Sequence, residues 1–289
     1  MFNRVAIIGL GLIGGSIGLA LHKTHASQQV VGYDLGAGVS DRACKIGAID
    51  QAYTNLADTV RNAELVILAT PVGTLHALLQ TIAPLLAADT VVTDVSSTKS
   101  QVTSWAEEFL PANIFFVGGH PMAGKEVSGV DVADADLFKN CVYCLTPTSH
   151  TRPAAISKVA SMVELLGARL RFLEPSEHDG LVAGVSHLPF LVATTLMNTV
   201  AQDPTWHDAS LLASSGFRDT TRLSAGSPEM YRDICFTNSN AIIRWLDAYA
   251  TNILALRDQI AKHDTDISET FTNTRTLRQQ WQSSQGQSD

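Results

Sequence analysis

The chain has 289 residues, 45% of them hydrophobic and 17% charged, and a formal net charge of −8, so it is long enough to bury a sizeable core in about two domains. The negative charge argues against nucleic acid and against an anionic membrane surface as partners. Four cysteines are too few for a disulfide scaffold at this length, so we expect four reduced thiols in a cytoplasmic protein.

Short apolar runs alternate with helical patterns through the first part of the chain. The sequence predicts strands at 4–9, 29–33, 65–69, 90–93, 114–117, 142–145 and 169–173. It predicts the intervening helices at 13–25, 74–86, 99–109 and 154–166. Strands separated by helices favour a mostly parallel sheet with right-handed crossovers. Residues 1–173 are therefore expected to form a Rossmann-like α/β domain.

From residue 174 onward the pattern is helical. Residues 176–200 are mostly apolar with a kink expected at Pro189, and residues 238–264 repeat apolar side chains at helical spacing. We find no strand signal there, and no apolar run after the N-terminal one is expected to span a membrane. Residues 174–289 are therefore predicted to form an all-helical C-terminal domain. Because so small an apolar domain often completes its burial against a second subunit, a homodimer through this domain is expected.

The first predicted strand runs directly into the pattern Gly9-x-Gly11-x-x-Gly14, and a helix follows. In such a turn the first glycine permits the tight bend, the second lets the backbone approach a pyrophosphate, and the third allows close helix–strand packing. The pyrophosphate then lies at the positive end of the helix. Asp34 ends the second strand, where a carboxylate binds ribose hydroxyls and repels a 2′-phosphate, so the pattern predicts NAD rather than NADP. Further cofactor contacts are expected from Leu12, Ile13, Thr70 and Ser97.

The segment Gly118-Gly119-His120-Pro121-Met122-Ala123-Gly124 follows another predicted strand. Its small side chains would let a ligand approach the backbone closely. An imidazole exchanges its proton readily near neutral pH, so His120 is a candidate for acid–base chemistry. The alternative is a glycine-rich turn that carries an incidental histidine.

Other polar groups lie in the second half of the chain. His178 and His187 are nine residues apart, which in an α-helix places them on roughly opposite faces, so we do not expect them to act as a pair. In the segment 216–222, an arginine would clamp a carboxylate through two parallel hydrogen bonds. Cys141 and Cys144 form a CxxC in a predicted strand, where the odd spacing turns the two thiols to opposite faces. No metal or redox site is therefore expected there.

In combination these motifs resemble those of the prephenate and arogenate dehydrogenase family of tyrosine biosynthesis. The matching segments are GLGLIGGS at 9–16, DVSSTK at 94–99, GGHPMAG at 118–124, EVSG at 126–129, EHD at 177–179, SHLP at 186–189, FRDTTR at 217–222 and PEMYRDI at 228–234. They spread in family order over residues 4–260, and no fused mutase or regulatory domain is expected. The resemblance implies an NAD-dependent, metal-free oxidative decarboxylation of prephenate to 4-hydroxyphenylpyruvate.

The resemblance also implies roles for individual residues. His120 matches the catalytic histidine that hydrogen-bonds the ring 4-hydroxyl, and Ser97 matches the serine that positions this histidine and the nicotinamide. Arg222 matches the arginine that binds the ring carboxylate, and Glu126 matches an acidic residue in the active-site loop. His187 is a further candidate for substrate contact. In this interpretation His120 accepts the hydroxyl proton while hydride leaves the same ring carbon.

Two positions depart from the family pattern. Phe190 stands where many members have a second histidine, and Lys125 stands where members often have a small hydroxyl residue. Lys125 would offer a second handle for a substrate carboxylate. Ser176 stands just ahead of the EHD segment, where in some members an acidic residue accompanies use of arogenate. We therefore favour prephenate, with arogenate or dual cyclohexadienyl dehydrogenase activity as the alternative.

Two other classes of protein remain as alternatives. A β-hydroxyacid dehydrogenase or imine reductase would share the fold, but no lysine lies between Lys158 and Lys262 to serve as its catalytic lysine. A non-catalytic NAD-binding protein is the second alternative. Formation of NADH with prephenate, arogenate or a 3-hydroxy acid separates these interpretations.

Overall fold

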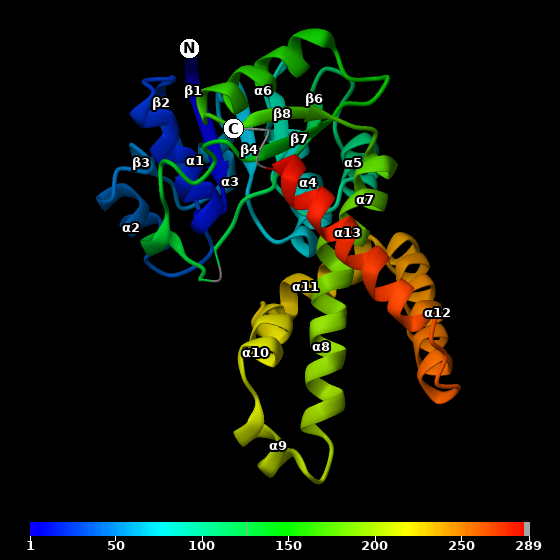
Figure 1. Ribbon diagram of the computed structural model, residues 1–289. Helices are drawn as coiled ribbons and strands as arrows, with labels where there is room; N and C mark the ends of the chain where they lie inside the picture. The colour runs from blue at the N-terminus through cyan, green and yellow to red at the C-terminus, as the bar shows by residue number, and fades with distance from the viewer. Residues whose placement is uncertain (126, 286–289) are drawn as a thin grey trace. The chain divides into compact units, whose positions relative to one another are not determined.

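The computed structural model describes residues 1–125 and 127–285 and divides into two compact units, Met1–Ile242 and Ile243–Asp289. The first unit is built on an eight-stranded sheet with the order β3-β2-β1-β4-β5-β6-β7-β8 (Figure 1). Its strands are β1 (Phe2–Ile8), β2 (Ser27–Tyr33), β3 (Gln51–Ala52), β4 (Leu65–Leu68), β5 (Val91–Asp94), β6 (Phe115–Pro121), β7 (Val142–Thr146) and β8 (Arg169–Phe172). All neighbouring strands run parallel except β6 and β7. The predicted mostly parallel, Rossmann-like sheet is confirmed.

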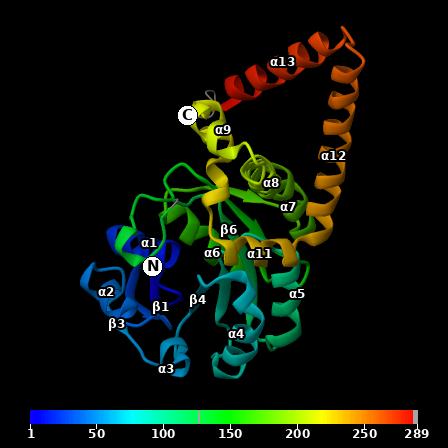
Figure 2. The ribbon, with the colours of Figure 1, turned by 90° about the horizontal axis from the view of Figure 1, so that it is seen from below.

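Helices cover both faces of this sheet. The apolar side chains of α1 (Leu12–Lys23), α2 (Val39–Lys45) and α6 (Pro153–Leu165) join the core on one face. Those of α3 (Leu56–Val60), α4 (Leu75–Ile82) and α5 (Ser100–Phe109) join the core on the other (Figure 2). All four residues of β4 are buried because both faces are covered, which explains their continuous apolar run. The short elements α2, α3 and β3 were not predicted, because they are too short to set up a periodic pattern.

Strand β6 continues four residues beyond its predicted end, so the alternative interpretation of a glycine-rich turn is wrong for residues 118–121. Gly118 pairs with Thr146, and His120 pairs with Cys144, in an antiparallel ladder with β7. Among the described residues of the connection from β6 to β7, the only regular element is the short 3-10 helix η3 (Val130–Val132). Without a crossover helix the chain reverses direction, which is the geometry of an antiparallel neighbour. All four cysteines are free thiols in the structure.

The helical part of the first unit begins with one long helical stretch. It consists of α7 (Pro175–Val182), the π-helix η4 (Ala183–His187) and α8 (Leu188–Ala201). Pro189 lies in the first turn of α8, and the irregularity predicted for it is the π-turn just before, where the Leu188 N–H donates to the Ala183 carbonyl. The elements that follow are α9 (Trp206–Leu212), α10 (Ser215–Thr221), η5 (Arg222–Ala225) and α11 (Pro228–Thr237).

By length and composition, the stretch Pro175–Ala201 is apolar enough to cross a membrane, contrary to our expectation for this region. A single stretch of this kind does not distinguish a membrane span from a helix that packs against protein. Within the first unit, α8 packs against α10 and η5.

Helix α12 (Ser239–Ala261) begins in the first unit, and its remainder forms the second unit together with α13 (Ile267–Gln285). Among the described residues after 173, every regular element is helical. The boundary at residues 173 and 174 stays a prediction.

Candidate active site

In the glycine-rich turn after β1, Gly9 and Gly14 are closely packed, whereas Gly11 faces open space. Gly9 has a φ of +92°, and a Cβ on it would lie 2.5 Å from the Ala69 carbonyl oxygen. A Cβ on Gly14 would overlap the carbonyl oxygen of Gly9. Over Gly11, by contrast, a Cβ would meet nothing within 4 Å. The backbone at Gly11 is therefore the face of the turn that a phosphate group can approach, at the N-terminus of α1.

A cavity of about 470 Å³ lies beside this turn. Its lining includes Gly9, Gly11, Asp34, Thr70, Pro71 and Leu78. Asp34 is fixed in place because its carboxylate accepts hydrogen bonds from the backbone N–H groups of Leu10 and Gly36, each at 2.7 Å. Apolar walls with one oriented carboxylate fit the adenosine end of a dinucleotide.

Of the other predicted cofactor contacts, only Thr70 lines this cavity, whereas Leu12, Ile13 and Ser97 do not. Leu12 is buried and Ile13 is half-buried in the first turn of α1. Thr70 lines the cavity and accepts a hydrogen bond from the Thr74 hydroxyl at 2.9 Å. Ser97 is half-buried in the turn between β5 and α5.

A buried ion pair ties that turn to β6. Lys99 and Asp94 are both fully buried, and the Lys99 ammonium donates hydrogen bonds to the Asp94 carboxylate and to the Gly119 carbonyl, the latter at 2.7 Å. The other oxygen of Asp94 accepts from the Gly119 N–H at 3.1 Å. Burial lowers the pKa of Lys99, against the attraction of Asp94. The backbone carbonyl and N–H of Gly119, the residue before His120, are thus both held by the Lys99–Asp94 ion pair. The sequence analysis did not predict this ion pair.

The paired glycines before His120 serve this packing. A Cβ on Gly118 would overlap the Thr146 hydroxyl, and one on Gly119 would lie 2.6 Å from the Asp94 carbonyl oxygen. Their small size therefore reflects contact between strands, and the expectation that a ligand approaches the backbone there is wrong for these two glycines.

His120 emerges from the end of β6, half-buried, beside a second histidine. Its Nδ1 lies 2.9 Å from Nε2 of His178, which is fully buried in α7. Nδ1 of His178 lies 2.9 Å from the Asp179 carboxylate. That carboxylate also accepts hydrogen bonds from the backbone N–H groups of Lys99 and Ser100, at 2.7 and 2.8 Å. Three side chains therefore form a chain of contacts from the strand end to the start of α5.

This environment changes the proton affinity of its members. Burial lowers the pKa of His120 well below 6.5, and the neighbouring His178, Lys99 and His187 lower it further. Burial raises the pKa of Asp179, but hydrogen bonds from His178, Ser100 and Lys99 lower it more, so the net shift is downward. His120 is consequently uncharged near pH 7, and Asp179 is an anion.

The helical stretch carries two buried histidines, His178 and His187. His187 is buried, and both it and His178 act electrostatically on His120. The five-residue turn η4 separates them, and a π-turn holds more residues than an α-turn, so the nine-residue rule does not apply. Our expectation of opposite faces rests on α-helical spacing, which this stretch does not keep. The Asn238 amide lies 3.4 Å from Nδ1 of His187 and also donates to the Asp179 carbonyl, and burial lowers the pKa of His187 to about 4.

The predicted substrate contacts are more dispersed. Arg222 is exposed at the start of η5, which packs against α8. Phe190 of α8 is buried and stacks on Tyr231, with ring centroids 3.3 Å apart. Lys125 is exposed and donates to the Val132 carbonyl at 3.2 Å and to Asp134 at 3.4 Å. Glu126 lies outside the described residues.

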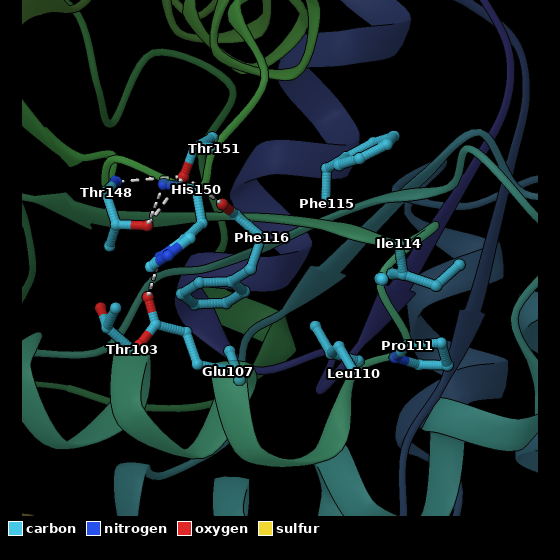
Figure 3. A pocket seen from close by; sticks show the side chains of 12 residues that line it. Thr103, Glu107, Leu110, Pro111, Ile114, Phe115, Phe116, Thr148, His150 and Thr151 are labelled. Carbon is cyan, nitrogen blue, oxygen red and sulfur yellow. Dashed lines mark hydrogen bonds and ion pairs between the residues drawn. The ribbon is translucent and has the colours of Figure 1, made fainter.

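A second cavity, of about 450 Å³, lies between α5, the start of β6 and the residues after β7 (Figure 3). Its lining includes Leu110, Phe116, Thr148 and Thr151. His150 Nδ1 lies 3.6 Å from the Glu107 carboxylate at its edge (Figure 3). None of the predicted site residues that the structure describes lines it, so it is separate from the candidate site.

Residues 17–172 match the family model for the prephenate dehydrogenase nucleotide-binding domain, and residues 174–276 match the prephenate dehydrogenase dimerization domain. The chain is 36% identical to prephenate dehydrogenase of Bacillus subtilis, over 92% of this chain and 72% of that protein. It is 34% identical to cyclohexadienyl dehydrogenase of Zymomonas mobilis, over 96% of each.

Among solved structures, the chain is similar to prephenate dehydrogenase from A. aeolicus in complex with hydroxyphenyl propionate and NAD+. The TM-score is 0.91 at 28% identity, over 97% of this chain and 98% of that one.

Proposed function

The chain belongs to the prephenate dehydrogenase family and is an NAD-dependent oxidoreductase, and on that premise we propose that it converts prephenate to 4-hydroxyphenylpyruvate in tyrosine biosynthesis. The observation that carries the proposal is His120. It is a neutral imidazole at the end of a sheet strand, in the same unit as the dinucleotide cavity, and it has a fixed partner on one ring nitrogen.

The proposed reaction transfers a hydride and a proton from the substrate. NAD, when bound, supplies the hydride acceptor. His120 accepts the 4-hydroxyl proton as hydride leaves ring C4, and the C1 carboxylate then leaves as CO2. The ring becomes aromatic, and His120 returns the proton to the phenolic oxygen. The proton therefore ends on the product, and the imidazole is neutral again at the end of each turnover.

The remaining site residues are proposed to bind and orient. The Asn238 amide facing Nδ1 of His187 leaves its Nε2–H as a donor for the substrate. We assign Ser97 to the nicotinamide and His120, because its turn is tied to β6 through Lys99. Lys125 and Glu126 are assigned to the substrate side of the loop after β6, although Lys125 must first leave Asp134.

Arg222 is proposed to bind the ring carboxylate. Replacing Arg222 by Ala should raise KM for prephenate roughly 10- to 100-fold with a smaller change in kcat, because a charge-assisted clamp is removed. Steady-state kinetics with varied prephenate would measure this. Arg218→Ala is a matched control, since Arg218 is exposed on neighbouring α10 beside Asp219. An unchanged KM in Arg222→Ala would rule out the assignment.

Arogenate is the alternative substrate, and the match to a cyclohexadienyl dehydrogenase favours keeping it. Phe190, stacked on Tyr231, offers an apolar wall where many members have a histidine.

The test of the proposed function is NADH formation by the purified protein with prephenate, arogenate and a 3-hydroxy acid, each with NAD and with NADP. We expect the highest kcat/KM with prephenate and NAD. No turnover with prephenate or arogenate would refute the proposal.

We also propose a cytoplasmic homodimer, with residues 1–173 as the cofactor domain and residues 174–289 as the dimerisation domain. The two family models support this division, since they meet between residues 172 and 174. Exposed apolar side chains on α12, among them Ile253, Leu254 and Ile260, support a further partner surface. A monomeric mass by light scattering at micromolar concentration would contradict the dimer.

A further inference from the structure

His178 has no place in the reaction as described so far, although it is one of the most enclosed polar groups in the chain. Its side chain is fully buried, and both ring nitrogens have a partner. One partner is the proposed base His120 and the other is the carboxylate of Asp179, each at 2.9 Å. A histidine kept only for packing would not need two polar partners aligned in this way.

The order of donors and acceptors in this chain is fixed from the Asp179 end. The Asp179 carboxylate is an anion that only accepts hydrogen bonds, and it is held by the backbone N–H groups of Lys99 and Ser100. Nδ1 of His178 must therefore carry the hydrogen that it shares with Asp179. In a neutral ring this leaves Nε2 of His178 as an acceptor.

The hydrogen position on His178 determines the hydrogen position on His120. Because Nε2 of His178 accepts, Nδ1 of His120 must donate, and Nε2 of His120 is left with its lone pair. That tautomer is the one that can take a proton from a substrate hydroxyl. A free imidazole, in contrast, samples both tautomers.

We propose that His178 is a positioning residue that, with Asp179 behind it, holds His120 in the tautomer and orientation in which Nε2 is the base. The inference rests on the proposed function, in which the 4-hydroxyl proton bonds to His120 Nε2 as hydride leaves C4. The His120 Nδ1–H stays in place, and its hydrogen bond to His178 strengthens while the ring is a cation. After CO2 leaves, the proton moves from Nε2 to the phenolic oxygen, so no proton enters or leaves the pair.

A matched pair of variants separates the two contacts of His178. The amide oxygen of Gln reaches the position of imidazole Nε2, so His178→Gln keeps an acceptor for His120. The shorter Asn places its amide near the position of Nδ1, so His178→Asn keeps only the contact with Asp179. We expect His178→Asn to lower kcat by about 10²-fold or more, as loss of the correct tautomer does in other enzymes. KM for prephenate should stay within about threefold, and His178→Gln should recover kcat to within about tenfold of wild type.

Several outcomes would overturn the inference. Equal kcat in the Asn and Gln variants, or a loss of kcat that tracks the folded fraction in thermal unfolding, would reduce His178 to a packing role. If wild type turns over prephenate and His178→Asn matches it, the positioning role fails while the proposed function stands. Wild type that turns over neither prephenate nor arogenate would overturn both.

The tautomer can also be read in wild-type protein, whether or not the variants fold. ¹⁵N NMR of histidine-labelled protein, with His120 assigned by comparison with His120→Asn, reports which ring nitrogen carries hydrogen. We expect Nδ1 of His120 to be protonated and Nε2 to be bare. The reversed tautomer would overturn the inference.

Discussion

Replacing His120 by Asn should lower kcat by roughly 10²- to 10⁴-fold, the usual range for loss of a general acid–base group. The hydroxyl proton then has no acceptor as hydride leaves, whereas the cavity beside Gly11 and Asp34 is untouched. KM for NAD should therefore change little. Stopped-flow or steady-state measurement of NADH formation would check both quantities. His150→Asn, at the edge of the separate cavity, is a matched control and should keep wild-type kcat.

The pH dependence of the wild-type enzyme tests the same residue. In the proposed reaction only the neutral form of His120 can accept the hydroxyl proton, so kcat/KM should fall on the acid side as the ring gains its proton. Burial, His178, Lys99 and His187 all lower its pKa below 6.5. We therefore expect the acid limb to lie below pH 6.5 and to disappear in the residual activity of His120→Asn. Near-normal turnover in that variant would exclude His120 as the base.

Replacing Lys99 by Met should lower the free energy of unfolding by about 3–5 kcal/mol, because it leaves the Asp94 carboxylate buried without a counter-charge. The backbone N–H groups of Ser96 and Gly119 still donate to Asp94, but they cannot neutralise it. Urea-induced unfolding followed by fluorescence or circular dichroism would measure the difference.

Lys23→Met is the control for this substitution, since its ion pair with Asp136 is exposed and screened by solvent. It should leave the unfolding midpoint almost unchanged. The double variant Lys99→Met, Asp94→Asn should be more stable than Lys99→Met alone, because no buried charge remains. A midpoint for Lys99→Met equal to that of Lys23→Met would contradict the proposed weight of the buried pair.

The parts that were predictable are those with a local pattern. A dinucleotide-binding turn is predictable from Gly9, Gly11, Gly14 and Asp34, because each position has its own steric or electrostatic reason. The alternation of strands and helices predicts a mostly parallel sheet. The helical spacing of apolar residues after residue 174 predicts helices. His120 was identified by its setting and by resemblance.

The parts that were missed depend on contacts between distant segments. The antiparallel pairing of β6 with β7 turns Gly118 and Gly119 from a loop into a strand, and no local signal distinguishes the two. The partner of His120 is 58 residues away in sequence, on a different element. The π-turn between His178 and His187 is likewise a feature that a count of α-helical residues cannot anticipate.

The continuous stretch Pro175–Ala201 has a consequence for how this enzyme can change. It carries His178, which contacts the proposed base His120, and Phe190, which stands where substrate choice is expected to be made. A substitution that shifts the stretch to admit a different side chain on the substrate also shifts the partner of His120. Selectivity and reactivity are thus mechanically linked, and evolution toward a new cyclohexadienyl acid should favour exchanges of side chains over movements of this helix.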